Sequence, residues 1–244
     1  MTDPITNLSG RARNAFLAAA IADIHADDAR LALFDAPPQL STELRLALAT
    51  CEAVTRSGGA GTGFLAALGH LTSAVNRRGP DGDPDAHADA AAATAAIYAA
   101  PLAFVLEPSH ASDEATVREV VSIIDGDNAA QTSALTLCLA LRHLLEHGTM
   151  AGFALPGGPA AAGIVGTAIE LAAANIAAGD FDGMLAQAAS CEHPRHAGLV
   201  AGLLLGAAGV PVPATGVDSL SERDELERIV ESFAQLVASG NFAV

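Results

Sequence analysis

Apolar side chains recur at intervals of three and four residues along most of the chain, whereas the alternation typical of a strand is almost absent. The final segment shows this spacing most clearly. Its apolar positions are Leu226, Ile229, Val230, Phe233, Leu236 and Val237. These positions share one face of a helix. Ser219 and Glu222 predict a capping box at the start of that helix, and Gly240 predicts its end.

The same spacing predicts helices in the middle of the chain. One helix begins near Ser112 and ends near Gly126. The next runs from about Ala129 to His147, and Gly148 closes it. Two further helices are expected, one on each side of Gly179.

The N-terminal third of the chain carries two more helical patterns. The first has an apolar face over residues 17–24 and places Asp23 and His25 close to the helix end. The second begins with Ser41 or Thr42 as its N-cap, because short hydroxyl side chains accept hydrogen bonds from the free backbone N–H groups.

Alanine dominates the apolar residues, which make up 51% of the chain, and the sequence has no tryptophan and a single tyrosine. A core of this composition must pack closely through small side chains. Similar alanine-rich helices flank both polar loops, 76–89 and 149–160, so neither loop is a linker between domains. We therefore expect a single all-α domain over residues 1–244, a multi-helix bundle of about eight to ten helices.

The formal net charge of −16 repels a phosphate backbone, so we expect no nucleic-acid partner. Three cysteines, Cys51, Cys138 and Cys191, predict reduced thiols in the cytoplasm because their number is odd and they lie in or beside apolar helical patterns. The first residues lack the layout of a signal peptide. The apolar, uncharged run Ala197–Val212 is shorter than the ~20 apolar residues of a spanning helix and contains Pro211, so no membrane partner is expected.

Several stretches can be compared with a known family. Residues 14–26 read NAFLAAAIADIHA, residues 93–102 read ATAAIYAAPL, and residues 191–213 read CEHPRHAGLVAGLLLGAAGVPVP. In this order, and over about 13–233, the layout and apolar framework resemble the ADP-ribosylglycohydrolase family. Members of that family are all-helical hydrolases that remove ADP-ribose from proteins with a pair of magnesium ions. The resemblance implies an orthogonal multi-helix bundle of the ADP-ribosylglycohydrolase type.

The sequence departs from this family at the motifs that bind the metals. Leu40 and Ser41 stand at the two Asp positions of the family motif Thr-Asp-Asp-Thr. His193 and Arg195 stand at the two Asp positions of the motif Gly-Asp-Thr-Asp-Thr. Magnesium prefers oxygen ligands, and Arg195 adds a permanent positive charge where a cation would lie. We therefore expect no magnesium pair, no other cofactor and no family catalytic residues.

The residues that remain at the family positions define the candidate site. Remnants of the family site are Asp23 and Thr42, with the neighbouring Glu43. Thr94 and Tyr98 replace a Gly and an Arg of the family's central run. The candidate ligand-binding residues are Asp23, His25, Tyr98, His193, Arg195 and His196.

The cluster at 191–196 allows three interpretations: a zinc site, an anion-binding site or an internal salt bridge. A zinc site from Cys191, His193 and His196 can be drawn, but Pro194 suits a first helical turn, so the two imidazole rings need not converge. The helix N-terminus and Arg195 favour an anion, either an ADP-ribose-like molecule or another phosphate or carboxylate. Alternatively, Arg195 forms a salt bridge with Asp23 or Glu43 and fills the family's metal cleft. Of these interpretations, the two without a metal ion fit the residues of the cluster better.

Three functional hypotheses follow from this departure. The first is a degenerate ADP-ribosylglycohydrolase-like protein, a pseudoenzyme that acts as a binding or regulatory module through a homo-oligomer or a protein partner. The alternative is a divergent hydrolase of ADP-ribosyl or related N-glycosidic bonds that uses Asp23, Glu43, His193 and His196. The third is a structural subunit whose cleft is filled by side chains. The fold alone does not decide among them, because function depends on the site.

Overall fold

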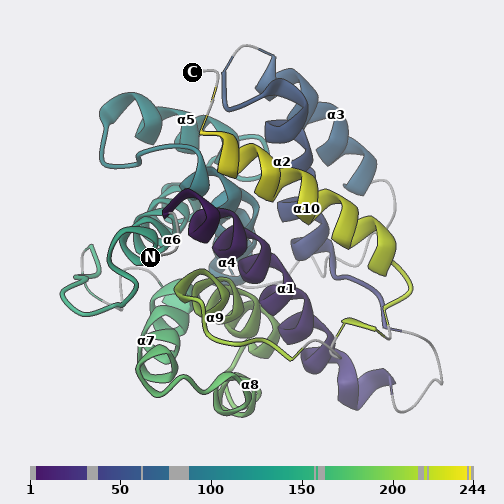
Figure 1. Ribbon diagram of the computed structural model, residues 1–244, viewed down its shortest axis with the longest axis vertical. Coiled ribbons are helices and arrows are strands. Elements are labelled where there is room, and N and C mark those ends of the chain that lie inside the picture. The colour runs from purple at the N-terminus through teal and green to yellow at the C-terminus, as the bar shows by residue number, and fades with distance from the viewer. Residues whose placement is uncertain are drawn as a thin grey trace.

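The computed structural model describes residues 4–31, 38–61, 63–76, 88–156, 158, 163–213, 217–218, 220–240 and 242. These residues form ten α-helices and one short 3-10 helix, and they contain no strand (Figure 1). The prediction of an all-α fold is therefore confirmed. None of the helices within these ranges has the length and apolarity needed to cross a bilayer.

The elements in chain order are α1 (Pro4–Leu31), α2 (Thr42–Ser57), α3 (Phe64–Asn76), α4 (Ala88–Ala99), η1 (Ala100–Phe104), α5 (Ala111–Val121), α6 (Asn128–His147), α7 (Gly163–Ala178), α8 (Phe181–Ala188), α9 (Pro194–Ala208) and α10 (Arg223–Ser239).

Helix α1 lies at the centre of the molecule, with α9 on one side and α10 on the other (Figure 1). The contact with α9 is close because three glycines, four residues apart, face α1. A Cβ at Gly206 would overlap the carbonyl oxygen of Asn14, and one at Gly202 would lie 2.9 Å from the carbonyl oxygen of Ala18. Small residues on both helices thus set the distance between their axes.

Large side chains fill the core where the small ones leave room. The rings of Phe16 on α1, Phe104 on η1 and Phe233 on α10 pack against one another with centroid distances of 5.7 to 6.0 Å. All three rings are buried, and two of the three ring pairs are edge-to-face, a favourable arrangement for aromatic quadrupoles. This cluster joins the N-terminal, central and C-terminal parts of the chain.

Arg11 on α1 ties together the ends of two other helices. Its guanidinium donates hydrogen bonds to the carbonyls of Leu144 and Leu145 near the end of α6, at 2.7 and 3.0 Å, and to that of Ala207 at the end of α9. The last carbonyls of a helix have no partner within the helix and carry partial negative charge. One half-buried cation therefore satisfies acceptors of two helices, and burial lowers its pKa.

Several predicted helix boundaries are confirmed. Ser41 is the N-cap of α2, and its hydroxyl accepts a hydrogen bond from the N–H of Leu44 at 3.2 Å. Gly148 and Gly240 end α6 and α10 in the left-handed conformation, with φ of 72° and 62°. Such a conformation is easy for glycine because it has no Cβ.

Other boundaries are corrected. Helix α1 continues to Leu31, so Asp23 and His25 do not lie close to its end. Helix α5 begins after His110, one residue earlier than predicted, and ends at Val121 rather than near Gly126.

The predicted capping box of α10 is also corrected, although Ser219 lies outside the described residues. The helix begins at Arg223, with Glu222 as an N-cap that makes no side-chain cap hydrogen bond. Its carboxylate instead accepts hydrogen bonds from the N–H of Leu40 and from Arg45. The Glu222 side chain therefore bonds to residues outside α10 and does not cap that helix. The loop predicted over 76–89 lies largely outside the described residues.

Candidate functional site

The candidate site lies where four helices meet. Asp23 comes from α1, Ser41 and Glu43 from the start of α2, and Thr94 from α4. The start of α9 adds the segment 193–196, with His193 at the N-cap and Pro194 in the first turn, as predicted. The Gly-rich contact between α1 and α9 fixes the position of Asp23 relative to this segment.

Asp23 is the most deeply buried charged group of the site, with an exposed fraction of 2%. Its Oδ2 accepts a hydrogen bond of 2.7 Å from the backbone N–H of Ser41, and its Oδ1 lies 3.5 Å from Nε of Arg195. Burial raises the pKa of Asp23 to about 6, which the Ser41 hydrogen bonds and Arg195 only partly oppose. The negative charge of Glu43 adds to the rise. The predicted salt bridge between Arg195 and this carboxylate is therefore confirmed.

His196 and Glu43 form a second pair at the junction, besides Arg195 and Asp23. Nε2 of His196 is 3.1 Å from the hydroxyl of Thr94 and 3.6 Å from Oε1 of Glu43. The Thr94 hydroxyl is also within hydrogen-bond distance of the carbonyl of Ala90, at 3.0 Å. It can donate to that carbonyl and accept from a protonated Nε2 of His196 at the same time.

The pKa of His196 is lowered, chiefly by burial, although Glu43 opposes this. The electrostatic effects of His193 and Arg195 lower it further. The lowered pKa favours the neutral imidazole at pH 7.

The structure brings together most of the predicted site residues. Asp23, Glu43, Arg195 and His196 lie within ion-pair distance of a partner, and the rings of His193 and His196 meet edge to face at 6.2 Å. Thr42, beside them in the sequence, is exposed.

Two of the predicted site residues, His25 and Tyr98, lie outside this cluster. His25 is exposed and lines a separate pocket of about 270 Å³ that also includes Pro194 and Leu185. Tyr98 is fully buried, and its hydroxyl forms a 2.9 Å hydrogen bond with Thr72 of α3. Burial raises the pKa of Tyr98 to about 12. Tyr98 is thus a core residue whose hydroxyl is engaged by Thr72.

Sequence reasoning named no role for Thr94 or Ser41 in the interactions of the site. Thr94 pairs with a residue 102 positions later, and local spacing carries no information on such a contact. Helix α4 is buried on nearly all sides, so no amphipathic pattern distinguishes its inward face.

The residues of the site do not suit a magnesium pair. The one family Asp that survives has a guanidinium as its neighbour, and Glu43 faces His196. Magnesium requires several oxygen ligands in near-octahedral geometry, which this set does not offer. Among the residues that the structure describes, no group of three or more His, Cys, Asp or Glu could hold a metal ion. Cys191 directs its thiol at the carbonyl of Gln187, 3.7 Å away.

Comparison with known proteins bears on the fold. The sequence matches no protein-family profile and no curated protein. Its structure is similar to a solved structure described as an ADP-ribosylglycohydrolase-related protein complex, with a TM-score of 0.60 and 19% identity. The match covers 95% of this chain and 99% of the other.

The helical architecture and the structural match together identify the fold. The chain has the all-α fold of the ADP-ribosylglycohydrolase-related proteins over nearly its whole length. At this level of identity, the side chains of the site and not the fold decide the function.

Proposed function

We propose that this protein is a divergent member of the ADP-ribosylglycohydrolase family that does not hydrolyse ADP-ribosyl bonds and acts as a binding or regulatory module. One observation carries the proposal. Arg195, which stands at a metal-binding Asp position of the family, lies 3.5 Å from the buried carboxylate of Asp23. The guanidinium of Arg195 therefore lies at the position where members of the family bind their metal ions.

Electrostatics supports this view. Two carboxylates, Asp23 and Glu43, are the acidic groups at the junction, and Arg195 and His196 face them. Two divalent cations would add four positive charges beside a guanidinium in a largely buried place, where like charges repel strongly. Binding of the metal pair would require Arg195 to move out and new oxygen ligands to move in.

A divergent hydrolase is the second candidate, and the raised pKa of Asp23 favours it. A carboxylic acid with a pKa of about 6 can act as a general acid or base near neutral pH. However, Asp23 is 2% exposed, and a general acid must lie within hydrogen-bond reach of its substrate. The first proposal is therefore preferred.

An activity assay separates the two candidates. Protein carrying ADP-ribosyl-arginine is incubated with wild type and Asp23→Asn in the presence of magnesium, and released ADP-ribose is measured by chromatography. We expect no release above the uncatalysed rate from either protein. Release by the wild type that Asp23→Asn abolishes would establish the hydrolase instead.

Thermal unfolding with ADP-ribose then tests for a binding module. A ligand at 100 times its dissociation constant stabilises the native state by roughly 2.7 kcal/mol. We expect stabilisation without magnesium, reduced in Arg195→Ala and kept in Arg56→Ala, whose exposed side chain pairs with Glu52. No shift at millimolar ADP-ribose, together with no hydrolysis, would leave a structural subunit in a homo-oligomer or with a protein partner. Light scattering measures the oligomeric state directly.

A further inference from the structure

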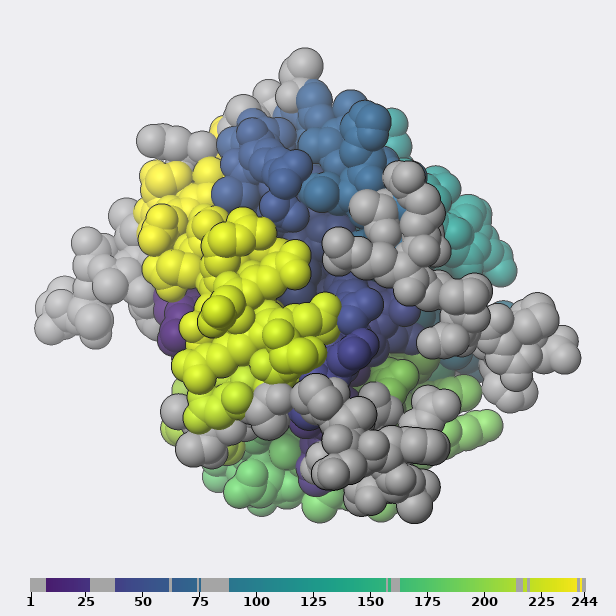
Figure 2. Space-filling view, turned by 90° about the vertical axis from the view of Figure 1, so that its right-hand side faces the viewer, coloured from purple at the N-terminus to yellow at the C-terminus, as the bar shows by residue number. Residues whose placement is uncertain are grey.

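A second pocket lies between α2, α3 and α10, away from the site at the start of α9. It encloses about 140 Å³. Its apolar walls include Leu48, Leu71, Val75, Leu226 and Ile229. A dry protein cavity of about this size is large enough for a benzene ring. Figure 2 shows the seam between the yellow-green surface of α10 and the blue surface of α2 and α3.

The charged groups of this pocket are unequal in number, one arginine against three glutamates. Arg45 is committed to Glu222, with an N–O distance of 3.0 Å. Glu222 also accepts the backbone N–H of Leu40 at 2.9 Å. This pair is therefore part of the wall, and its charges cancel.

The other two glutamates differ from each other. Glu52 is shared by Arg56 at 2.7 Å and Arg228 at 3.6 Å. Glu225, in the first turn of α10, is exposed and has no hydrogen bond or ion pair with any residue that the structure describes. The pocket thus presents an apolar interior and one carboxylate that forms no ion pair with the described residues.

We propose that this pocket binds a small apolar amine, with its hydrocarbon body between α2, α3 and α10 and its protonated amino group at Glu225. A carboxylate or phosphate group is disfavoured at Glu225, because this carboxylate, unlike Glu52 and Glu222, pairs with no arginine among the described residues and repels an anion. No lysine side chain of the chain can occupy this position, since all twelve of its Lys and Arg residues are arginines. This proposal is independent of the function proposed for the α9 site.

Titration of the protein with benzylamine, benzyl alcohol and benzoate tests the proposal, with methyl chemical shifts in NMR spectra as the readout. The three probes share one ring and differ in charge. We expect benzylamine to shift the methyl groups of Leu71, Val75 and Ile229 and to bind several-fold more tightly than benzyl alcohol. Benzoate should bind most weakly. Equal affinity for amine and alcohol, or shifts confined to other methyl groups, would overturn the proposal.

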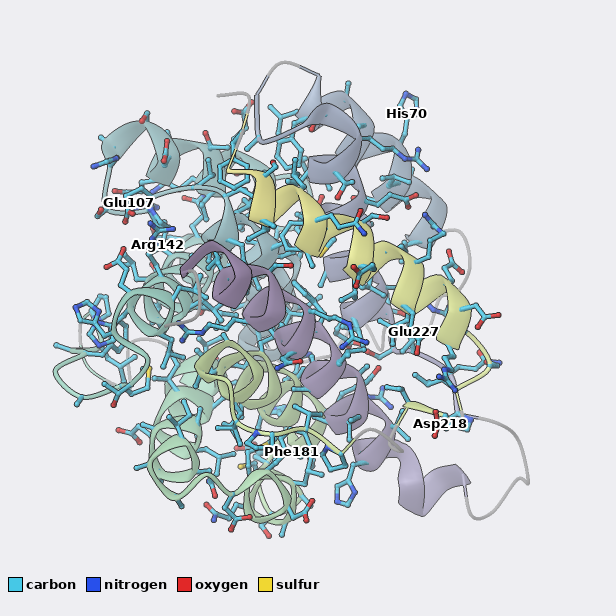
Figure 3. The ribbon with its side chains drawn as sticks, viewed as in Figure 1. His70, Glu107, Arg142, Phe181, Asp218 and Glu227 are labelled. Carbon is cyan, nitrogen blue, oxygen red and sulfur yellow. The ribbon has the colours of Figure 1, made fainter. Side chains whose placement is uncertain are left out.

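Two variants locate the amino group and the ring. Glu225→Gln should weaken benzylamine binding about 2- to 5-fold, as expected for an exposed ion pair, and leave benzyl alcohol unchanged. The matched control is Glu227→Gln on the same helix, because Glu227 pairs with Arg223 and does not line the pocket (Figure 3). Ala49→Leu places extra carbons in the pocket and should abolish binding of all probes. An unchanged benzylamine affinity in Glu225→Gln would refute the placement of the amino group.

Discussion

Replacing Gly206 by alanine would place a methyl group against the backbone of α1. The added Cβ would overlap the carbonyl oxygen of Asn14, and neither backbone can move without separating the two helices. A glycine-to-alanine change in a helix otherwise gains about 1 kcal/mol in helix propensity. Overpacking of a tight contact costs about 1–3 kcal/mol, and contact with backbone is at the upper end. We expect Gly206→Ala to lower the free energy of unfolding by about 1–2 kcal/mol.

Two other glycines on the same face of α9 provide matched controls. A Cβ at Gly202 would lie 2.9 Å from the carbonyl oxygen of Ala18, whereas one at Gly198 would lie 3.6 Å from Cβ of Ala22, an ordinary contact. Gly198→Ala should therefore stabilise the protein by about 0.5–1 kcal/mol through helix propensity. Gly202→Ala should fall between the other two variants.

Urea unfolding followed by far-UV circular dichroism measures the three changes under the same conditions. The order of stability should be Gly198→Ala first, then wild type, then Gly202→Ala, and Gly206→Ala last. A Gly206→Ala variant as stable as Gly198→Ala would show that the distance between α1 and α9 is not set by these glycines.

Three further predictions concern buried polar groups. The native state raises the pKa of Asp23 from 3.8 to about 6, so it binds this proton more tightly than the unfolded state does. The stability of wild type relative to Asp23→Asn should therefore fall by about 2 kcal/mol from pH 4 to pH 7, measured by urea unfolding. A difference that rises with pH would contradict this. Arg11→Met removes three hydrogen bonds to helix carbonyls and should cost about 2–4 kcal/mol by the same assay, whereas a loss below about 0.5 kcal/mol would refute the anchoring role. Tyr98→Phe leaves the buried hydroxyl of Thr72 without its partner and should cost about 1–2 kcal/mol, most of which Thr72→Val in the same protein should restore; two additive losses would argue against a coupled pair.

Local chemistry explains why much of the fold could be predicted from sequence. Gly148 and Gly240 end helices because a left-handed residue is needed there, and Ser41 caps a helix because its hydroxyl reaches a free N–H. The spacing of apolar residues predicts α10 clearly, because one face of that helix is buried and the opposite face is exposed. Helix α4 is mostly buried alanine, so its orientation could not be predicted.

The candidate site was predictable in part, through the family resemblance. The pairing of Arg195 with a carboxylate followed from placing opposite charges at one family site. The hydrogen bonds of His196 with Thr94 and of Tyr98 with Thr72 join different helices, so no pattern within one helix reports them. The cytoplasmic location stays a prediction.

Crystals grown with manganese, which takes the same ligands as magnesium and scatters X-rays anomalously, test the central claim most directly. We predict no anomalous peak within coordination distance of the carboxylates of Asp23 or Glu43, with Arg195 still beside Asp23. One or two peaks between these carboxylates, with Arg195 turned away, would contradict the proposal that the Arg195 guanidinium has replaced the metal pair.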